Sequence, residues 1–174
     1  MTLVPDFITP DEEKALLATF VAGVVKRTKG RNSIRRFGSN VPYKGNMVDA
    51  TVPEPFAFLL DRLVEQGLLK SRPDSVTVNE YLVGQEITPH IDSVTSGEVI
   101  SVLSLMSDAT MYFDRHKHGR HAVHLPARSL VQMRGEIRHD WQHSIAPVKQ
   151  KRFSMVFRCG KPKNPEYHTG GPGR

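Results

Sequence analysis

Residues 152–158 read Arg-Phe-Ser-Met-Val-Phe-Arg, an alternation of polar and apolar side chains that is typical of a β-strand. Successive side chains of a strand point to opposite faces, so the apolar residues share one face, namely Phe153, Met155 and Phe157. We predict that this apolar face packs against the core. The opposite face carries Arg152, Ser154 and Arg158. Its two guanidinium groups either lie in solvent or, if buried, need anionic partners such as the carboxylates of a small diacid.

A possible metal site lies upstream of this strand, in His90-Ile91-Asp92. On an extended strand, residues two apart point to the same face, so His90 and Asp92 can reach one point together. His143, far downstream, is the candidate third ligand. Two imidazoles and one carboxylate are the ligand set of non-haem Fe(II) oxygenases. His139 is an alternative third ligand, and a second tract could bind Zn(II) or Ni(II) loosely through His116, His118, His121 and His124.

The order of the elements predicts the fold class. Thr9, Pro10 and Glu12 form a helix start, and apolar residues at helical spacing continue it to about Lys26. A second helix is expected from about Pro53 to Gly67. Beyond residue 74 the period changes to two, and strands are expected at 76–81, 98–105, 110–113, 121–125, 129–133 and 152–158. Helices followed by many short strands indicate a mainly β, α+β protein, with the helices packed outside a double-sheet jelly roll.

Length and composition are those of one globular domain. The chain has 174 residues, of which 39% are hydrophobic, and no apolar run long enough to cross a membrane. We therefore expect a single domain over residues 1–160 and a mobile tail over residues 161–174. The protein is expected to be a monomer that does not bind membranes. The single cysteine, Cys159, excludes an internal disulfide and favours a reducing compartment, which is the cytoplasm or, in a eukaryote, also the nucleus.

The net charge of +6 is distributed unevenly. Between Val21 and Val48 the chain has seven basic residues and no acidic one. This segment is either a solvated basic loop or an edge that contacts phosphates, in which case binding weakens as salt rises. An aromatic side chain could stack on a base, and the candidates are Phe37, Tyr43 and Trp141.

The pattern of motifs over about residues 74–158 resembles the AlkB family of Fe(II)/2-oxoglutarate dioxygenases. The matching positions are Asn79, Tyr81, Gly84, Gln85, His90 and Asp92, then Pro126, Ser129 and Leu130, then Gly135, Glu136, Arg138, His143 and Pro147, and finally Arg152 and Arg158. Residues 1–72 resemble the family's N-terminal helices and nucleotide-recognition lid more loosely, through Arg35, Arg36, Phe37 and Gly38. Residues 73–160 would then form the jelly-roll core.

The resemblance implies a set of site residues and cofactors. Iron would be held by His90, Asp92 and His143, and O2 would be the oxidant. Arg152 would bind the far carboxylate of 2-oxoglutarate and Arg158 the carboxylate next to the metal, with Asn79, Tyr81 and Ser154 completing that pocket. Arg35, Arg36, Phe37 and Tyr43 would contact the nucleic acid. Members of the family commonly carry Asn where this chain has Ser154.

The implied reaction is oxidative removal of N-alkyl groups from bases of DNA or RNA, which releases formaldehyde and succinate. His90-Ile91-Asp92-Ser93 and the stretch from Arg138 to Trp141 are closer to the branches that act on tRNA wobble uridines and to bacterial repair members. The residues after Asp92 are Ser93-Val94-Thr95-Ser96-Gly97, without the acidic side chains common in base-repairing members. A tRNA wobble-uridine hydroxylase, a methyl-lysine demethylase on the same fold and a non-enzymatic binding module are the alternatives.

Overall fold

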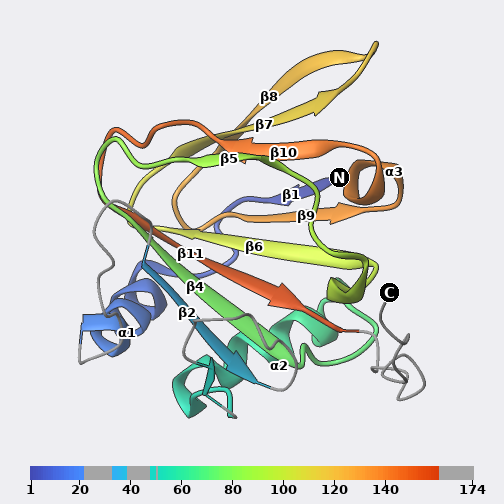
Figure 1. Cartoon of the computed structure of the whole chain (residues 1–174). Helices are drawn as coiled ribbons and strands as arrows, with labels where there is room; N and C mark the ends of the chain where they lie inside the picture. Colours follow the sequence, from blue (N-terminus) through green and yellow to red (C-terminus); the bar gives the residue numbers. More distant parts are fainter. Residues whose placement is uncertain (22–32, 39–47, 50, 161–174) are drawn as a thin grey trace, which may run out of the picture.

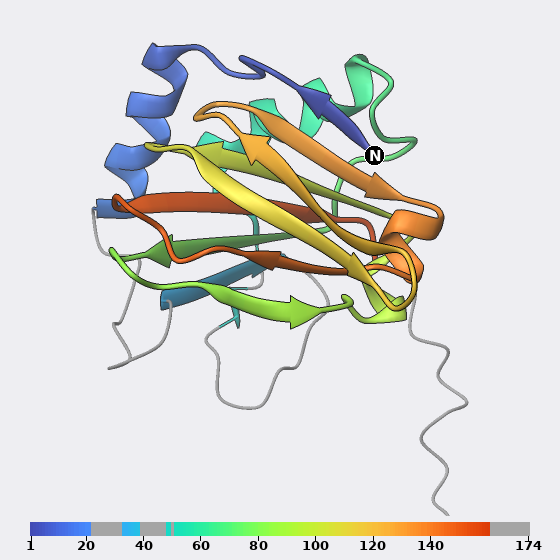
Figure 2. The same ribbon diagram turned by 90° about the horizontal axis from the view of Figure 1, so that it is seen from above.

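Two β-sheets face each other in the computed structural model, which describes residues 1–21, 33–38, 48–49 and 51–160 (Figures 1 and 2). The larger sheet has the strand order β1 (Thr2–Val4), β9 (Leu130–Arg134), β6 (Val99–Leu105), β11 (Arg152–Arg158), β4 (Ser75–Tyr81), β2 (Ser33–Gly38) and β3 (Val48–Asp49). The smaller sheet has the order β5 (Ile87–His90), β10 (Gln142–Ile145), β7 (Ala109–Arg115) and β8 (Gly119–Leu125). All pairings are antiparallel except that of β2 with β3. The expected mainly β, jelly-roll architecture is confirmed.

The helices α1 (Pro10–Val21) and α2 (Ala57–Glu65) lie on the outer face of the larger sheet (Figure 1). Their buried side chains, among them Leu16, Phe20 and Leu63, form one core cluster with the apolar faces of β4, β6 and β11. The burial of this shared apolar surface is the main force that holds the helices on the sheet. None of the helices in the described part of the chain has the length and hydrophobicity of a transmembrane helix.

The predicted helix starts are confirmed. The Thr9 N–H donates to Glu12 Oε2 at 2.9 Å, and the Glu12 N–H donates to Thr9 Oγ1 at 3.2 Å, which is a reciprocal capping box. The expected end of this helix near Lys26 lies outside the described residues. The second helix begins as a 3₁₀ turn, η1 (Glu54–Phe56), before α2.

The long strands lie where the alternation predicts them, within a residue or two at most ends. The strands β1, β2, β3 and β10 were not predicted, and β5 was expected only as a strand that carries His90 and Asp92. A further difference concerns Asp92. We expected His90 and Asp92 on one strand, but β5 ends at His90 and Asp92 lies in the connection to the 3₁₀ turn η2 (Val94–Ser96).

The central strand β11 separates the core from a cavity between the sheets. Phe153, Met155 and Phe157 belong to the cluster beneath the helices. On the opposite face, Arg152, Ser154, Val156 and Arg158 line the cavity. The prediction that one face of this strand is core is therefore confirmed, and the arginines face a pocket instead of the bulk solvent.

Candidate active site

The antiparallel pairing of β5 with β10 brings two histidines together. His143 lies directly opposite His90 in the register, and the centroids of their rings are 4.3 Å apart. Asp92 comes back toward them from the connection after β5. One ligand atom from each of His90, Asp92 and His143 lies within 4.8 Å of the other two, and no other such group of three occurs in the described ranges. The geometry suits a metal held on one side, with the remaining positions open.

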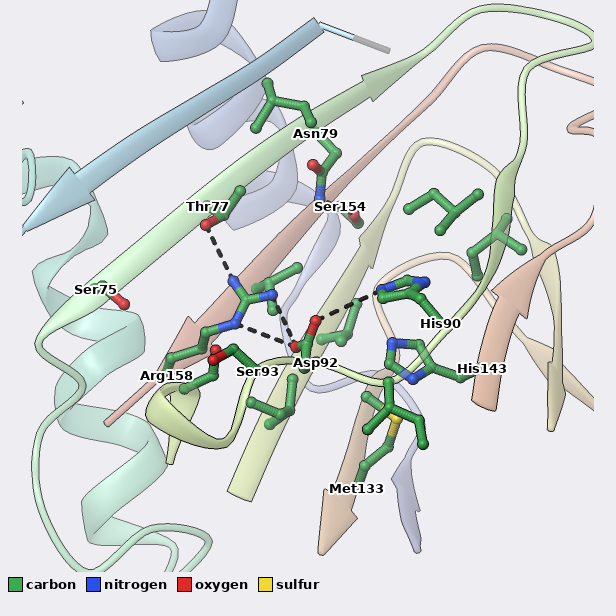
Figure 3. Close-up of a pocket in the computed structure, with 18 of the residues that line it drawn as sticks. Ser75, Thr77, Asn79, His90, Asp92, Ser93, Met133, His143, Ser154 and Arg158 are labelled. Atoms are coloured by element: carbon green, nitrogen blue, oxygen red, sulfur yellow. Dashed lines mark hydrogen bonds and ion pairs between the residues drawn. The ribbon is translucent and has the colours of Figure 1, made fainter. Parts of the chain in front are cut away.

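Hydrogen bonding orients the first histidine. His90 Nδ1 is 2.9 Å from the backbone oxygen of Thr88. A carbonyl oxygen only accepts, so Nδ1 is the donor, and in the neutral ring the lone pair is on Nε2. Nε2 faces Asp92 Oδ1 at 3.5 Å (Figure 3). The hydrogen bond with Asp92 raises the pKa of His90, while burial opposes the shift.

His143 is a buried imidazole that is neutral near pH 7. Burial lowers its pKa to about 4, and the neighbouring His90 acts in the same direction. A neutral ring keeps a lone pair available for a metal. His143 can therefore offer a lone pair to a metal, and His90 can do so at Nε2 once that nitrogen has lost the proton it shares with Asp92.

Arg158 holds the Asp92 carboxylate in place. Its Nη2 and Nε donate to Asp92 Oδ2 at 2.9 and 3.3 Å, and its Nη1 donates to Thr77 Oγ1 at 3.1 Å (Figure 3). Burial alone would raise the pKa of Asp92, but the hydrogen bond with His90 and the Arg158 charge hold it well below its usual range. Asp92 is therefore ionised, with Oδ2 occupied by Arg158 and Oδ1 directed at His90. Arg158 thus contacts a metal ligand, in addition to the carboxylate-binding role expected for it.

Arg152 is a buried cation that has no acidic partner in the described part of the chain. Its side chain is fully buried, and Nη2 donates to Ser104 Oγ at 3.0 Å. The guanidinium carbon lies 4.9 Å from the centre of the Tyr81 ring. Nε and Nη1 are buried without a hydrogen-bond partner. Burial lowers the pKa of Arg152, and two unpaired donors on one buried guanidinium fit a bound carboxylate.

A small polar network lies on the same face of the sheet. Asn79 Nδ2 donates to Ser154 Oγ at 3.2 Å, and the Tyr81 hydroxyl is 3.4 Å from the same oxygen. Burial raises the pKa of Tyr81, so its phenol is neutral. Asn79, Tyr81 and Ser154 thus supply uncharged hydrogen-bonding groups near Arg152, as a site for a keto diacid requires.

These groups open into one cavity of about 740 Å³. Its apolar wall comes from both sheets and includes Ile100, Val102, Met111, Met133 and Ile145. Serine and threonine residues also line it, namely Ser75, Thr77, Ser93, Thr95 and Ser96. Asp92 is the only acidic residue among those that line it in the described part of the chain.

The residues predicted to contact nucleic acid do not lie together in the structure. Arg36 lines the cavity. Arg35 points to the other face of β2, where its guanidinium carbon is 5.0 Å from the centre of the Phe37 ring. Phe37 is only 2% exposed and packs edge-on against Phe56, so this candidate for stacking on a base is a core residue. Because β2 is a strand, its alternation places Arg35 and Phe37 away from the cavity. Tyr43 lies outside the described residues.

The alternative metal ligands are elsewhere. His139 Nε2 is 3.0 Å from Glu98 Oε2 and takes no part in the His90–Asp92–His143 group. His118 and His121 lie beside the half-buried Trp141, with ring centroids 6.0 and 5.3 Å from it. Trp141 does not line the cavity. Two residues that support the site were not singled out, Thr77 and Thr88, and Arg138 was noted only as a motif position, without its contact to the Asp92 backbone. Only Thr77 had a local signal, since it shares the strand face of Asn79.

Comparison with known proteins agrees with this site. A model of the 2OG-Fe(II) oxygenase superfamily matches residues 23–168. The chain belongs to this superfamily and is a dioxygenase that uses Fe(II), 2-oxoglutarate and O2. Within it, the resemblance to AlkB-like proteins is confirmed by the relatives.

One relative is the tRNA (carboxymethyluridine(34)-5-O)-methyltransferase alkbh8 of Xenopus tropicalis, 35% identical over 86% of this chain and 25% of the relative. Another is the Alkylated DNA repair protein ALKBH8 homolog of Arabidopsis thaliana, 31% identical over 82% of this chain and 49% of the relative. The chain thus spans about a quarter and about half of their lengths. The solved structure of OsALKBH1 superposes with a TM-score of 0.69 at 17% identity, covering 90% of this chain and 96% of that chain.

Proposed function

We propose that this chain oxidises alkyl groups on nucleic-acid bases, and that its reaction is the removal of N-alkyl groups from DNA or RNA. The observation that carries the proposal is the meeting of His90, Asp92 and His143 beside the buried, partly unpaired Arg152. The relatives' names connect similar chains with tRNA and with alkylated DNA. We further propose that the protein acts as a monomer in the cytoplasm or the nucleus.

The residues divide the work of the reaction. His90, Asp92 and His143 would hold the iron, and Arg152 with Asn79, Tyr81 and Ser154 would hold 2-oxoglutarate. With O2, the bound iron and 2-oxoglutarate supply the insertion of one oxygen atom into a substrate C–H bond, while the other oxygen enters succinate and CO2 is released. On an N-methyl group the product is an N-hydroxymethyl group, which breaks its C–N bond to release formaldehyde.

The protein's own contribution is orientation and the exclusion of water. Arg158 and Thr88 fix the ligand side chains, and the apolar wall would exclude water around the reacting carbon. Arg36 is the candidate for a contact with the nucleic-acid backbone at the edge of the cavity, and Arg35 is not placed for such a contact.

A second candidate reaction is hydroxylation of a carbon-linked group on a tRNA wobble uridine. The lining of the cavity favours it, because Ser93, Thr95 and Ser96 carry hydroxyl groups, which make neutral hydrogen bonds. Asp92 is already paired with Arg158, so no free carboxylate among the described lining residues stabilises a positively charged methylated base. A neutral base such as uracil would bind without that electrostatic cost.

The experiment is a turnover assay with Fe(II), ascorbate and 2-oxoglutarate on a panel of alkylated DNA, alkylated RNA, tRNA and a methyl-lysine peptide. Nucleosides are analysed by mass spectrometry and succinate is quantified. Loss of a methyl group supports the first reaction, and a gain of one oxygen on uridine supports the second. Turnover of the peptide alone would refute both. His90→Ala should abolish all turnover, whereas His124→Ala, a histidine paired with Asp108 outside the cavity, should not.

A further inference from the structure

A fully buried arginine connects the two chain segments that carry the metal ligands. Arg138 lies in the short helix α3 (Glu136–His139), which precedes β10 and His143. It is 1% exposed. The Glu98 carboxylate, which is nearby in the fold, pairs with His139 instead. A buried guanidinium requires a defined set of acceptors, because its burial is otherwise costly.

Those acceptors are two consecutive backbone carbonyls. Arg138 Nη1 donates to the Asp92 oxygen at 3.0 Å, and Nη2 donates to the Ser93 oxygen at 2.6 Å. The planar guanidinium presents two parallel donors, so it fixes both the position and the direction of the two carbonyl groups. Nε has no hydrogen-bond partner. Both hydrogen bonds of Arg138 are therefore directed at the backbone of Asp92 and of the residue that follows it, Ser93.

The adjacent histidine holds the other end of the same connection. His139 Nε2 is 3.0 Å from Glu98 Oε2. Between these two attachments, Gly97 has a φ of 91° and approaches the Cys159 backbone so closely that a Cβ would lie 2.0 Å from its oxygen. The segment 92–98 is thus attached to α3 at both ends and packed on the end of β11 in the middle.

The contacts with α3 fix the backbone around Asp92, which no strand pairing holds in place. β5 ends at His90, so no strand pairing fixes the backbone of Asp92. His143, in contrast, is held in β10 between β5 and β7. We infer that Arg138 is a positioning residue: it sets Asp92 against His143 for metal binding, and through the Ser93 carbonyl it places the hydroxyl-bearing wall of the cavity. The inference rests on the iron chemistry of the superfamily and is independent of the substrate.

The test compares Arg138→Met and Arg138→Lys with the wild type. Methionine has a similar length and removes both hydrogen bonds, whereas lysine keeps the charge and can reach one carbonyl. Arg134→Met is the matched control, because Arg134 Nη2 also donates to a backbone carbonyl, that of Leu68 at 3.4 Å, but away from the cavity. The dissociation constant for Mn(II), used in place of Fe(II), is measured by titration calorimetry on protein shown to be folded by circular dichroism.

For Arg138→Met we expect the metal affinity to fall by about 10–100-fold, the usual cost of losing a group that orients a ligand. Lysine should restore part of it, and Arg134→Met should leave it unchanged. Hydrogen exchange should rise within residues 92–98 and not in the distant helix α2. A merely structural role would lower the thermal midpoint without changing the metal affinity of the folded protein.

Metal affinity within about twofold of the wild type in folded Arg138→Met would overturn the inference. If that variant does not fold, Arg138→Lys is judged by the same criterion. Neither measurement involves nucleic acid, so a failure here leaves the proposed substrate untouched. Conversely, the inference stands if the metal affinity falls as expected and no base in the panel is oxidised.

Discussion

Replacing Arg152 by methionine should stabilise the ligand-free protein and remove its response to 2-oxoglutarate. Arg152 is fully buried, with one hydrogen bond to Ser104 and two nitrogen atoms that have no partner. A buried charge of this kind lowers the free energy of unfolding until an anion compensates it. Methionine fills a similar volume without any polar atom that needs a partner.

The size of the effect follows from opposing contributions. Exchange of a buried ionic group for an apolar side chain stabilises by up to about 4 kcal/mol, and a buried charge without an ionic partner lies at the upper end, about 3–4 kcal/mol. Loss of the Ser104 hydrogen bond and of the Tyr81 ring contact each costs about 1 kcal/mol. A net gain of about 1–2 kcal/mol corresponds to a rise in the thermal midpoint of about 2–8 °C for a chain of this size. At a 2-oxoglutarate concentration about 100 times its Kd, the wild type gains about 2.7 kcal/mol and overtakes the variant.

The assay is thermal unfolding followed by circular dichroism at one fixed Mn(II) concentration, with and without 2-oxoglutarate. Arg72→Met is the control, since Arg72 is an exposed arginine paired with Asp61 and contributes little. A lower midpoint for ligand-free Arg152→Met would refute the view that Arg152 is an uncompensated charge. A full 2-oxoglutarate shift in that variant would refute its contact with the cosubstrate.

Two other predictions concern the cavity edge and the acid stability. Arg36→Gln should weaken the binding of single-stranded RNA and lower the dependence of that binding on salt, whereas Arg35→Gln should change neither. Binding is measured by fluorescence anisotropy. Equal effects of the two substitutions would contradict the strand alternation. The hydrogen bond from Arg62 lowers the pKa of Glu12 from 4.5 to about 2, so this pair's contribution to stability is complete above about pH 4.5 and is lost as the pH falls toward 2. Urea unfolding should therefore show a difference between wild type and Glu12→Gln that narrows over that range, and a constant difference would exclude the linkage.

The strands that could be predicted from the sequence are those whose two faces differ in chemistry. β11 was located to the residue, because aromatic and methionine side chains alternate with polar ones between Arg152 and Arg158. The first helix was visible from its capping box. β2 was missed because its two apolar residues, Ile34 and Phe37, are three apart and show no alternation, and its strand conformation comes from pairing with β4. Without that strand, Phe37 could not be assigned to the core and stayed among the candidates for base stacking.

The metal ligands were recognised by residue type and family resemblance, and not by the strand geometry first invoked for them. β5 and β10 have four residues each, too short for a clear alternation, and their pairing joins segments distant in the sequence. The register that sets His143 opposite His90 is a tertiary property, which a local pattern does not contain. The Arg138 contacts with the Asp92 connection are of the same kind.

The arrangement of the site across two sheets explains why such long-range contacts matter. The histidines belong to the smaller sheet, and Arg152 and Arg158 belong to β11 in the larger one. Asp92 lies in the connection between the sheets and is held from both sides, by Arg158 through its carboxylate and by Arg138 through its backbone. A change in the spacing of the sheets would therefore move the 2-oxoglutarate pocket relative to the histidines. Asp92 is the ligand that is hydrogen-bonded to arginines on both sides, so its position should change most when the spacing of the sheets changes.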